Sequence, residues 1–246
     1  MQLDAETAEW KGVGSVVAIG ECYTPEWYVV RLGSGAGSYY MADDECETPL
    51  LQLPFRPAAF ATSPDQERMF IAGAHGELET VGIDNARGTA QALWQGSHPF
   101  SGSFIADLVA DPTKRFVYVA SGPNYDWYSI DSGGAWTYRG TAAAVGLFPM
   151  VFDPQGNNAY WNGTWLKVDQ DSGELSFAGT FGGSSVIPAT IDPAGRYLFN
   201  INFWQDSTGR RHSDLVVFSL QPSGEPRRVY DLKDTIYYLP TAVRVP

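Results

Sequence analysis

VIPATIDPAGRYLFNINFWQDSTGRRHSDLVVFSLQPSGEPRRVYDL, residues 186–232, divides into four short apolar or aromatic runs separated by polar segments. The runs at 186–191, 197–202, 215–220 and 227–232 predict β-strands. Asp192-Pro-Ala-Gly195 and Gln221-Pro-Ser-Gly-Glu225 predict tight turns, because Pro and Gly suit turn dihedrals. The intervening residues, Phe203 to Ser213, predict a long polar loop. This stretch therefore predicts a four-stranded antiparallel sheet.

The turn after the first strand recurs along the chain. It reads Ser63-Pro64-Asp65-Gln66, Asp111-Pro112-Thr113-Lys114, Asp153-Pro154-Gln155-Gly156 and Asp192-Pro193-Ala194-Gly195, so its prolines are 48, 42 and 39 residues apart. A second strand follows each copy, and the third and fourth strands are joined by Gly-containing turns after Asp84, Asp131, Asp171 and Pro222. Periods of this length are typical of β-propeller blades.

The pattern of an apolar strand, Asp-Pro-x-Gly-Arg and then Tyr-Leu-Phe-Asn resembles the repeats of YVTN-type and lactonase-like β-propellers. The resemblance is best in Asp192–Asn200 and Asp111–Ala120, and it covers roughly residues 57–246. It implies a fold more than an activity.

The two ends of the chain predict one shared blade. Residues 239–246 align with the first strand at 187–193, whereas residues 15–19, 27–32 and 38–42 predict second, third and fourth strands without a first. We therefore predict a single domain, 1–246, that is a closed five-bladed propeller of four-stranded antiparallel blades. The blades are 57–100, 101–144, 145–183, 184–234, and 235–246 with 1–50. A fragment of a larger ring or surface protein is the alternative.

Composition excludes several classes of function. The formal net charge is −12, with 16 basic and 28 acidic residues, which argues against binding nucleic acid or an anionic membrane. No apolar run is long enough to span a bilayer, and the acidic start is unlike a signal peptide. Cys22 and Cys46 are expected on one face of the composite blade. We favour a disulfide between them, and with it an extracellular, periplasmic or cell-surface location; two free thiols leave the cytoplasm open.

In a propeller, ligands bind where the loops between second and third strands and the segments joining blades converge. These loops are rich in aromatic residues, which suit protein hot spots and stacking on sugars, although packing between blades is the competing explanation for each ring. The candidate aromatic ligand-binding residues are Trp27, Tyr125, Trp127, Trp165, Phe203, Trp204, Tyr237 and Tyr238.

Charged candidates are fewer. Arg210, Arg211 and His212 form a basic group in the long loop, suited to a carboxylate or an acidic partner, or they are simply solvated. Asp107, near the start of an innermost strand, is expected at the channel mouth as a polar channel residue rather than a catalyst. His75, His98 and His212 lie in separate blades without metal-type spacing, so we expect no metal and no cofactor.

The sequence therefore predicts a non-catalytic binding module whose aromatic loops recognise a protein partner or, in a lectin-like manner, a glycan. The rival hypothesis is a lactonase-like or glycan-cleaving enzyme with its site at the channel mouth. Catalysis would require convergent carboxylates there, or carboxylates with a histidine.

Overall fold

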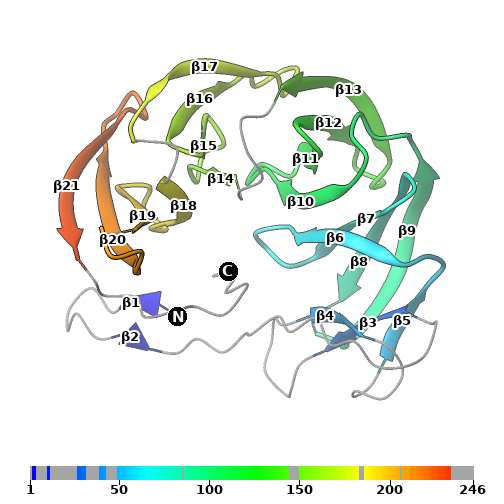
Figure 1. The fold of residues 1–246 in the computed structure, drawn as a ribbon. Helices are drawn as coiled ribbons and strands as arrows, with labels where there is room; N and C mark the ends of the chain where they lie inside the picture. Colours follow the sequence, from blue (N-terminus) through cyan, green and yellow to red (C-terminus); the bar gives the residue numbers. More distant parts are fainter. Residues whose placement is uncertain are drawn as a thin grey trace.

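The computed structural model describes residues 2–3, 10–11, 27–31, 39–42, 49–84, 86–143, 150–182, 186–205 and 207–233. These residues form strands and turns, and no helix occurs among them. Four four-stranded antiparallel sheets follow one another along the chain and stand around a common centre (Figure 1). The fold is the all-β propeller class that the repeated turns predict.

Within each sheet, strands that are neighbours in sequence pair with one another. We call the sheets blades 1 to 4, and Figure 1 shows their first strands innermost and their fourth strands outermost. The strands are β6 (Pro57–Thr62), β7 (Arg68–Gly73), β8 (Glu77–Asp84) and β9 (Thr89–Ser97) in blade 1; β10 (Ile105–Ala110), β11 (Phe116–Ser121), β12 (Asn124–Ile130) and β13 (Trp136–Ala143) in blade 2; β14 (Val151–Phe152), β15 (Asn158–Trp161), β16 (Thr164–Val168) and β17 (Leu175–Thr180) in blade 3; and β18 (Val186–Ile191), β19 (Tyr197–Gln205), β20 (Arg211–Leu220) and β21 (Pro226–Leu232) in blade 4.

The repeated Asp-Pro turn is held by its own aspartate. The Oδ1 atom of Asp111 accepts the backbone N–H groups of Arg115 and Phe116, both at 2.9 Å. Asp153 and Asp192 accept the two equivalent N–H groups in blades 3 and 4. The side chain thus satisfies donors that a tight turn leaves without backbone partners.

The turn between the third and fourth strands docks each blade onto the blade before it. The carbonyl of Gly134 accepts the Thr80 hydroxyl at 2.7 Å. In the next two blades the carbonyls of Gly173 and Gly224 accept the hydroxyls of Tyr118 and Tyr160, at 2.8 and 2.7 Å. All three glycines have positive φ, which glycine adopts without the steric cost that a Cβ atom brings. The turn between the third and fourth strands therefore fixes the register between neighbouring blades.

Two β-bulges also recur. In blades 1, 2 and 4 an alanine, Ala58, Ala106 or Ala189, is the extra residue in the innermost strand. In all four blades the outermost strand carries one extra residue at the equivalent point: Leu93, Arg139, Ala178 and Val229. Bulges increase local twist, which matches the strongly twisted blades of a ring.

Apolar side chains fill the spaces between blades. Phe70, Leu108 and Tyr128 belong to the core cluster between blades 1 and 2, and Tyr118 and Trp161 to the one between blades 2 and 3. Since fully burying one such side chain contributes roughly 1.5–3 kcal/mol, these layers are the main source of stability.

A fifth, three-stranded sheet has the order β4 (Tyr39–Ala42), β3 (Trp27–Arg31), β5 (Pro49–Leu53). The predicted antiparallel pairing of the strands at 27–32 and 38–42 is confirmed. The sequence analysis predicts no strand within 46–55, and this was wrong: β5 pairs with β3, and Leu53 is buried beside Phe60 and Met69. Leu51 and Leu53 gain burial by pairing here. A short pair, β1 (Gln2–Leu3) with β2 (Trp10–Lys11), completes the strands. Residues 15–19 and 235–246, with which we close a fifth blade, lie outside the described residues.

Candidate functional site

The loops between second and third strands define one end of the propeller, which we call the loop face. They comprise residues 74–76, 122–123, 162–163 and 206–210. Segments that join blades reach the same end. The His98 N–H donates to the Gly76 carbonyl at 2.9 Å, and the Gly122 N–H donates to the Phe104 carbonyl at 2.8 Å. The loop face is therefore built from both kinds of segment, as predicted.

Tyr125 and Trp127 are not exposed loop residues, and the prediction of their position was wrong. Both lie in β12 and are buried. Tyr125 packs edge-on against Trp161, with ring centroids 4.8 Å apart, and the Trp127 indole donates to the Ser172 carbonyl at 3.3 Å. β12 begins at Asn124, so the loop is only two residues long, and both side chains point toward blade 3. Burial raises the pKa of Tyr125, and the nearby charge of Asp107 raises it further.

Trp165 is also tied into its blade. It lies half-buried in β16, where its indole N–H donates to Asn158 Oδ1 at 2.9 Å. The Lys167 ammonium lies 5.0 Å from the ring centroid, within the range of a cation–π contact. These contacts indicate that the Trp165 ring has a structural role within blade 3.

Other predicted residues fall where the structure gives no side chain. Trp27 lies in β3 without a described side chain, and Cys22, Cys46, Tyr237 and Tyr238 lie outside the described residues. Their roles, and the disulfide, stay predictions.

The segment Phe203 to Ser213, predicted as a loop, is mostly a β-hairpin. Phe203 pairs with Ser213, Trp204 with His212 and Gln205 with Arg211. Within the described chain, β18 stops pairing at Asn202 and β21 stops at Leu215, so these residues form a two-stranded extension of blade 4. We call residues 203–213 the arm. The loop prediction failed because residues 205–211 are mostly polar, which is typical of a loop. The ends of β19 and β20 nevertheless pair with each other, and this pairing keeps the backbone extended.

The arm has two unlike faces. Trp204, His212 and Asp214 share one face, whereas Phe203 and Ser213 lie on the other, because side chains alternate along a strand. The Trp204 ring stacks on His212 at a centroid distance of 4.1 Å and an angle of 10°. Its indole N–H donates to Asp214 Oδ2 at 2.9 Å. The ring is thus fixed in orientation while 38% of the residue remains exposed.

The innermost strands contain few polar or charged side chains. Among β6, β10, β14 and β18, Asp107 in β10 is the acidic residue. It is 7% exposed and follows the bulge at Ala106, and its Oδ1 accepts the Leu108 N–H at 2.9 Å. The other residues of these strands are apolar, apart from Thr62 and Thr190. Asp107 therefore lies on an innermost strand, and the described inner strands carry no second acid. Its position at the channel mouth stays a prediction.

A polar group that the sequence analysis missed lies at the loop-face end of blade 2. The buried Asp126 accepts both the N–H and the hydroxyl of Ser101 on Oδ2, at 2.9 and 3.0 Å. Asn124 and Thr141 donate to the same Ser101 Oγ, each at 3.3 Å. This group fastens the joining segment to blade 2. Ser101 and Asp126 are far apart in sequence, so no local pattern indicates their contact.

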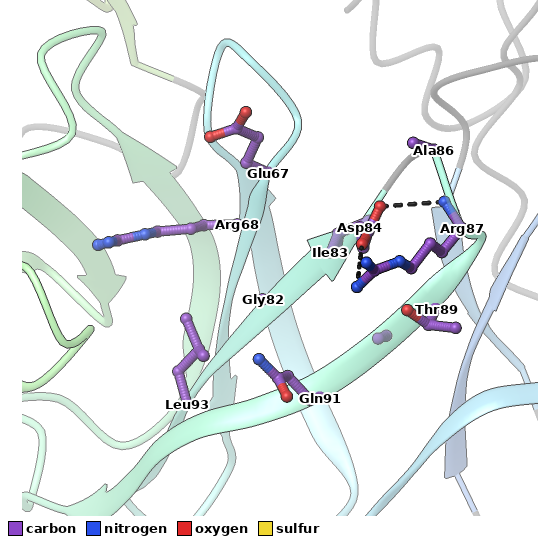
Figure 2. Close-up of a pocket in the computed structure, with 11 residues that line it drawn as sticks. Glu67, Arg68, Gly82, Ile83, Asp84, Ala86, Arg87, Thr89, Gln91 and Leu93 are labelled. Carbon is purple, nitrogen blue, oxygen red and sulfur yellow. Dashed lines mark hydrogen bonds and ion pairs between the residues drawn. The ribbon is translucent and has the colours of Figure 1, made fainter.

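The described surface also has a hollow of about 710 Å³ at the end opposite the loop face (Figure 2). Its two arginines are engaged: Arg87 pairs with Asp84 at 3.5 Å, and Arg68 donates to the carbonyls of Asp131 and Ser132. The hollow is lined by residues of blade 1, and its Arg68 side chain serves the contact with the turn of blade 2.

Within the ranges that the structure describes, no group of three or more His, Cys, Asp or Glu side chains could hold a metal ion. His98 stacks on Tyr138 at 4.3 Å and belongs to the aromatic layer between blades. The same ranges contain no helix that is long and apolar enough to cross a membrane.

Comparison with solved structures supports the propeller class. A protein from Lactobacillus plantarum has a TM-score of 0.57 at 15% identity, over 94% of this chain and 76% of its own. A Bacteroides uniformis protein, assigned provisionally as a 6-phosphogluconolactonase, has a TM-score of 0.57 at 16% identity, over 84% of this chain and 67% of its own. A Desulfotomaculum acetoxidans protein of unknown function has a TM-score of 0.52 at 14% identity, over 77% of this chain and 60% of its own. No family model matches the sequence, and no curated protein matches it significantly.

The chain is thus a β-propeller by fold. At these identities the likeness covers the architecture, and it agrees at that level with the lactonase-like pattern of the repeats.

Proposed function

We propose that the protein is a lactonase-like propeller that hydrolyses a lactone of a sugar acid. The observation that carries the proposal is the shared fold with the Bacteroides uniformis protein, whose provisional assignment is to 6-phosphogluconolactone hydrolysis. The repeat pattern Asp192–Asn200, which resembles lactonase-like propellers, agrees with this fold. A lactonase therefore takes the place of the purely non-catalytic binding module that the sequence predicts.

Lactone hydrolysis needs a base that takes a proton from water. The water oxygen attacks the ring carbonyl, the ring C–O bond breaks, and the ring oxygen leaves as a hydroxyl once it has gained a proton. Asp107 is our choice for the base, because it is the acid on the described innermost strands and one carboxylate oxygen is already oriented by the Leu108 N–H. A general base contributes typically about 10²–10⁴-fold to a rate.

The proposal is tested by titrating the acid released from D-glucono-δ-lactone and, as a ring without sugar hydroxyls, from δ-valerolactone. We expect Asp107→Asn to lose most of the activity. Asp171→Asn is the matched control, because Asp171 is exposed in a turn at the opposite end of blade 3. Equal activity in the two variants would remove Asp107 from the mechanism.

A second candidate is the non-catalytic binding of a protein partner or a glycan. It is favoured by the largely apolar inner strands and by the exposed Trp204 of the arm. Binding of the wild-type protein to a glycan array without turnover of any lactone would favour this candidate. A location outside the cytoplasm remains a prediction under either function.

A further inference from the structure

The arm presents a tryptophan whose geometry is set before any ligand arrives. One face of the Trp204 ring lies against His212, 4.1 Å away and nearly parallel. The Asp214 carboxylate, only 7% exposed, fixes the indole N–H at 2.9 Å. The ring therefore has one covered face, one fixed edge and a remaining exposed surface.

Such preorganisation matters for weak ligands. A ligand that stacks on a free side chain must first immobilise it, which costs free energy. Here His212 and Asp214 have already restricted both rotatable bonds of Trp204. Phe203 is more exposed, at 50%, but lies on the other face of the arm without a stacking partner among the described rings.

The surroundings favour a particular ligand. The exposed Arg210 lies in the turn of the arm, next to Arg211, although the whole chain has a formal net charge of −12. A guanidinium attracts carboxylate and phosphate groups and repels cations. A flat ring on a hairpin whose turn carries such a group suits a six-membered sugar ring with an acidic substituent.

The geometry points to the Trp204–His212 stack as a binding platform for an acidic pyranose sugar, with Arg210 attracting the acidic substituent. The inference rests on the ligand class that the proposed lactonase and the glycan-binding alternative share, a sugar ring. It adds the residues that contact that ring and the one, Asp214, that positions Trp204.

The test uses the intact chain and non-hydrolysable probes. D-glucuronate, glucose 6-phosphate, glucose and tetramethylammonium are titrated by isothermal calorimetry or ligand-observed NMR. The proteins are wild type, Trp204→Ala, Trp204→Phe, Arg210→Gln and the opposite-face control Phe203→Ala. Far-ultraviolet circular dichroism checks that each variant folds.

We expect the acidic sugars to bind more tightly than glucose, and tetramethylammonium not to bind. Trp204→Ala should weaken binding by about tenfold, as expected for loss of one stacking ring, and Trp204→Phe should restore part of it. Arg210→Gln should weaken the acidic sugars only, and Phe203→Ala should have less than about a twofold effect, because its ring faces away.

Failure to bind any sugar, or equal losses in Trp204→Ala and Phe203→Ala, would overturn the inference. Lactone turnover in the same variants separates the two proposals. Sugar binding without turnover rejects the lactonase alone, whereas lactone turnover by a wild-type protein that binds none of the sugars rejects the platform alone.

Discussion

Replacing Tyr160 by phenylalanine tests how the blades are held in register. Tyr160 is fully buried, and its hydroxyl donates to the Gly224 carbonyl in the turn of blade 4 at 2.7 Å. Phenylalanine keeps the ring but leaves this carbonyl without that donor. Leaving a buried acceptor unsatisfied costs about 1–3 kcal/mol, so the free energy of unfolding should fall by that amount. For a chain of this size, the melting temperature should fall by about 2–4 °C per kcal/mol.

Urea unfolding followed by tryptophan fluorescence measures the change, which should appear in the midpoint with an unchanged slope. Tyr197→Phe is the control, because Tyr197 is 40% exposed, and a change within about 0.5 kcal/mol is expected there. If Tyr160→Phe were as mild as Tyr197→Phe, the hydroxyl-to-turn contact would not fix the register of blades 3 and 4.

Three further predictions concern stability. Gly173→Ala should lower the free energy of unfolding by about 2–5 kcal/mol, because φ is +75° and the new Cβ would lie 2.5 Å from Phe116 Cδ1. Gly179→Ala is the control and should be nearly neutral in the same urea assay. Burial raises the pKa of Glu79, although the Gln95 hydrogen bond opposes this, so its contribution to stability is present below about pH 4.5 and declines as pH rises. The free energy of unfolding of Glu79→Gln, relative to that of the wild type, should therefore be higher at pH 8 than at pH 5. A relative free energy that rises on acidification would contradict this. Burial also raises the pKa of Tyr118, Tyr128 and Tyr160 above the ordinary value of 10.0, so unfolding should become easier as pH rises above 10, with a shallower fall in Tyr118→Phe.

The repeats could be predicted because their information is local. An aspartate or serine, a proline and a following glycine or polar residue specify each first turn within about five residues, and Asp111 shows why: its carboxylate binds N–H groups four and five residues ahead. A second strand follows each of these turns, as predicted, beginning at Arg68, Phe116, Asn158 and Tyr197.

The site was harder to predict because side-chain exposure depends on neighbouring blades. Tyr125 and Trp127 follow a Gly-Pro turn, and only the β12 pairing shows that both point into the layer shared with blade 3. The arm looks polar in sequence, yet Trp204 and His212 hold it as a hairpin by a cross-strand contact. Ser101 and Asp126 meet only when the joining segment folds against blade 2.

The most direct test of the proposed function is the initial rate of D-glucono-δ-lactone opening, measured against protein concentration and corrected for the spontaneous reaction. We predict a rate proportional to wild-type protein that falls by about 10²-fold or more in Asp107→Asn and is unchanged in Asp171→Asn. A wild-type rate equal to that of buffer for every sugar lactone tested would contradict the assignment as a lactonase.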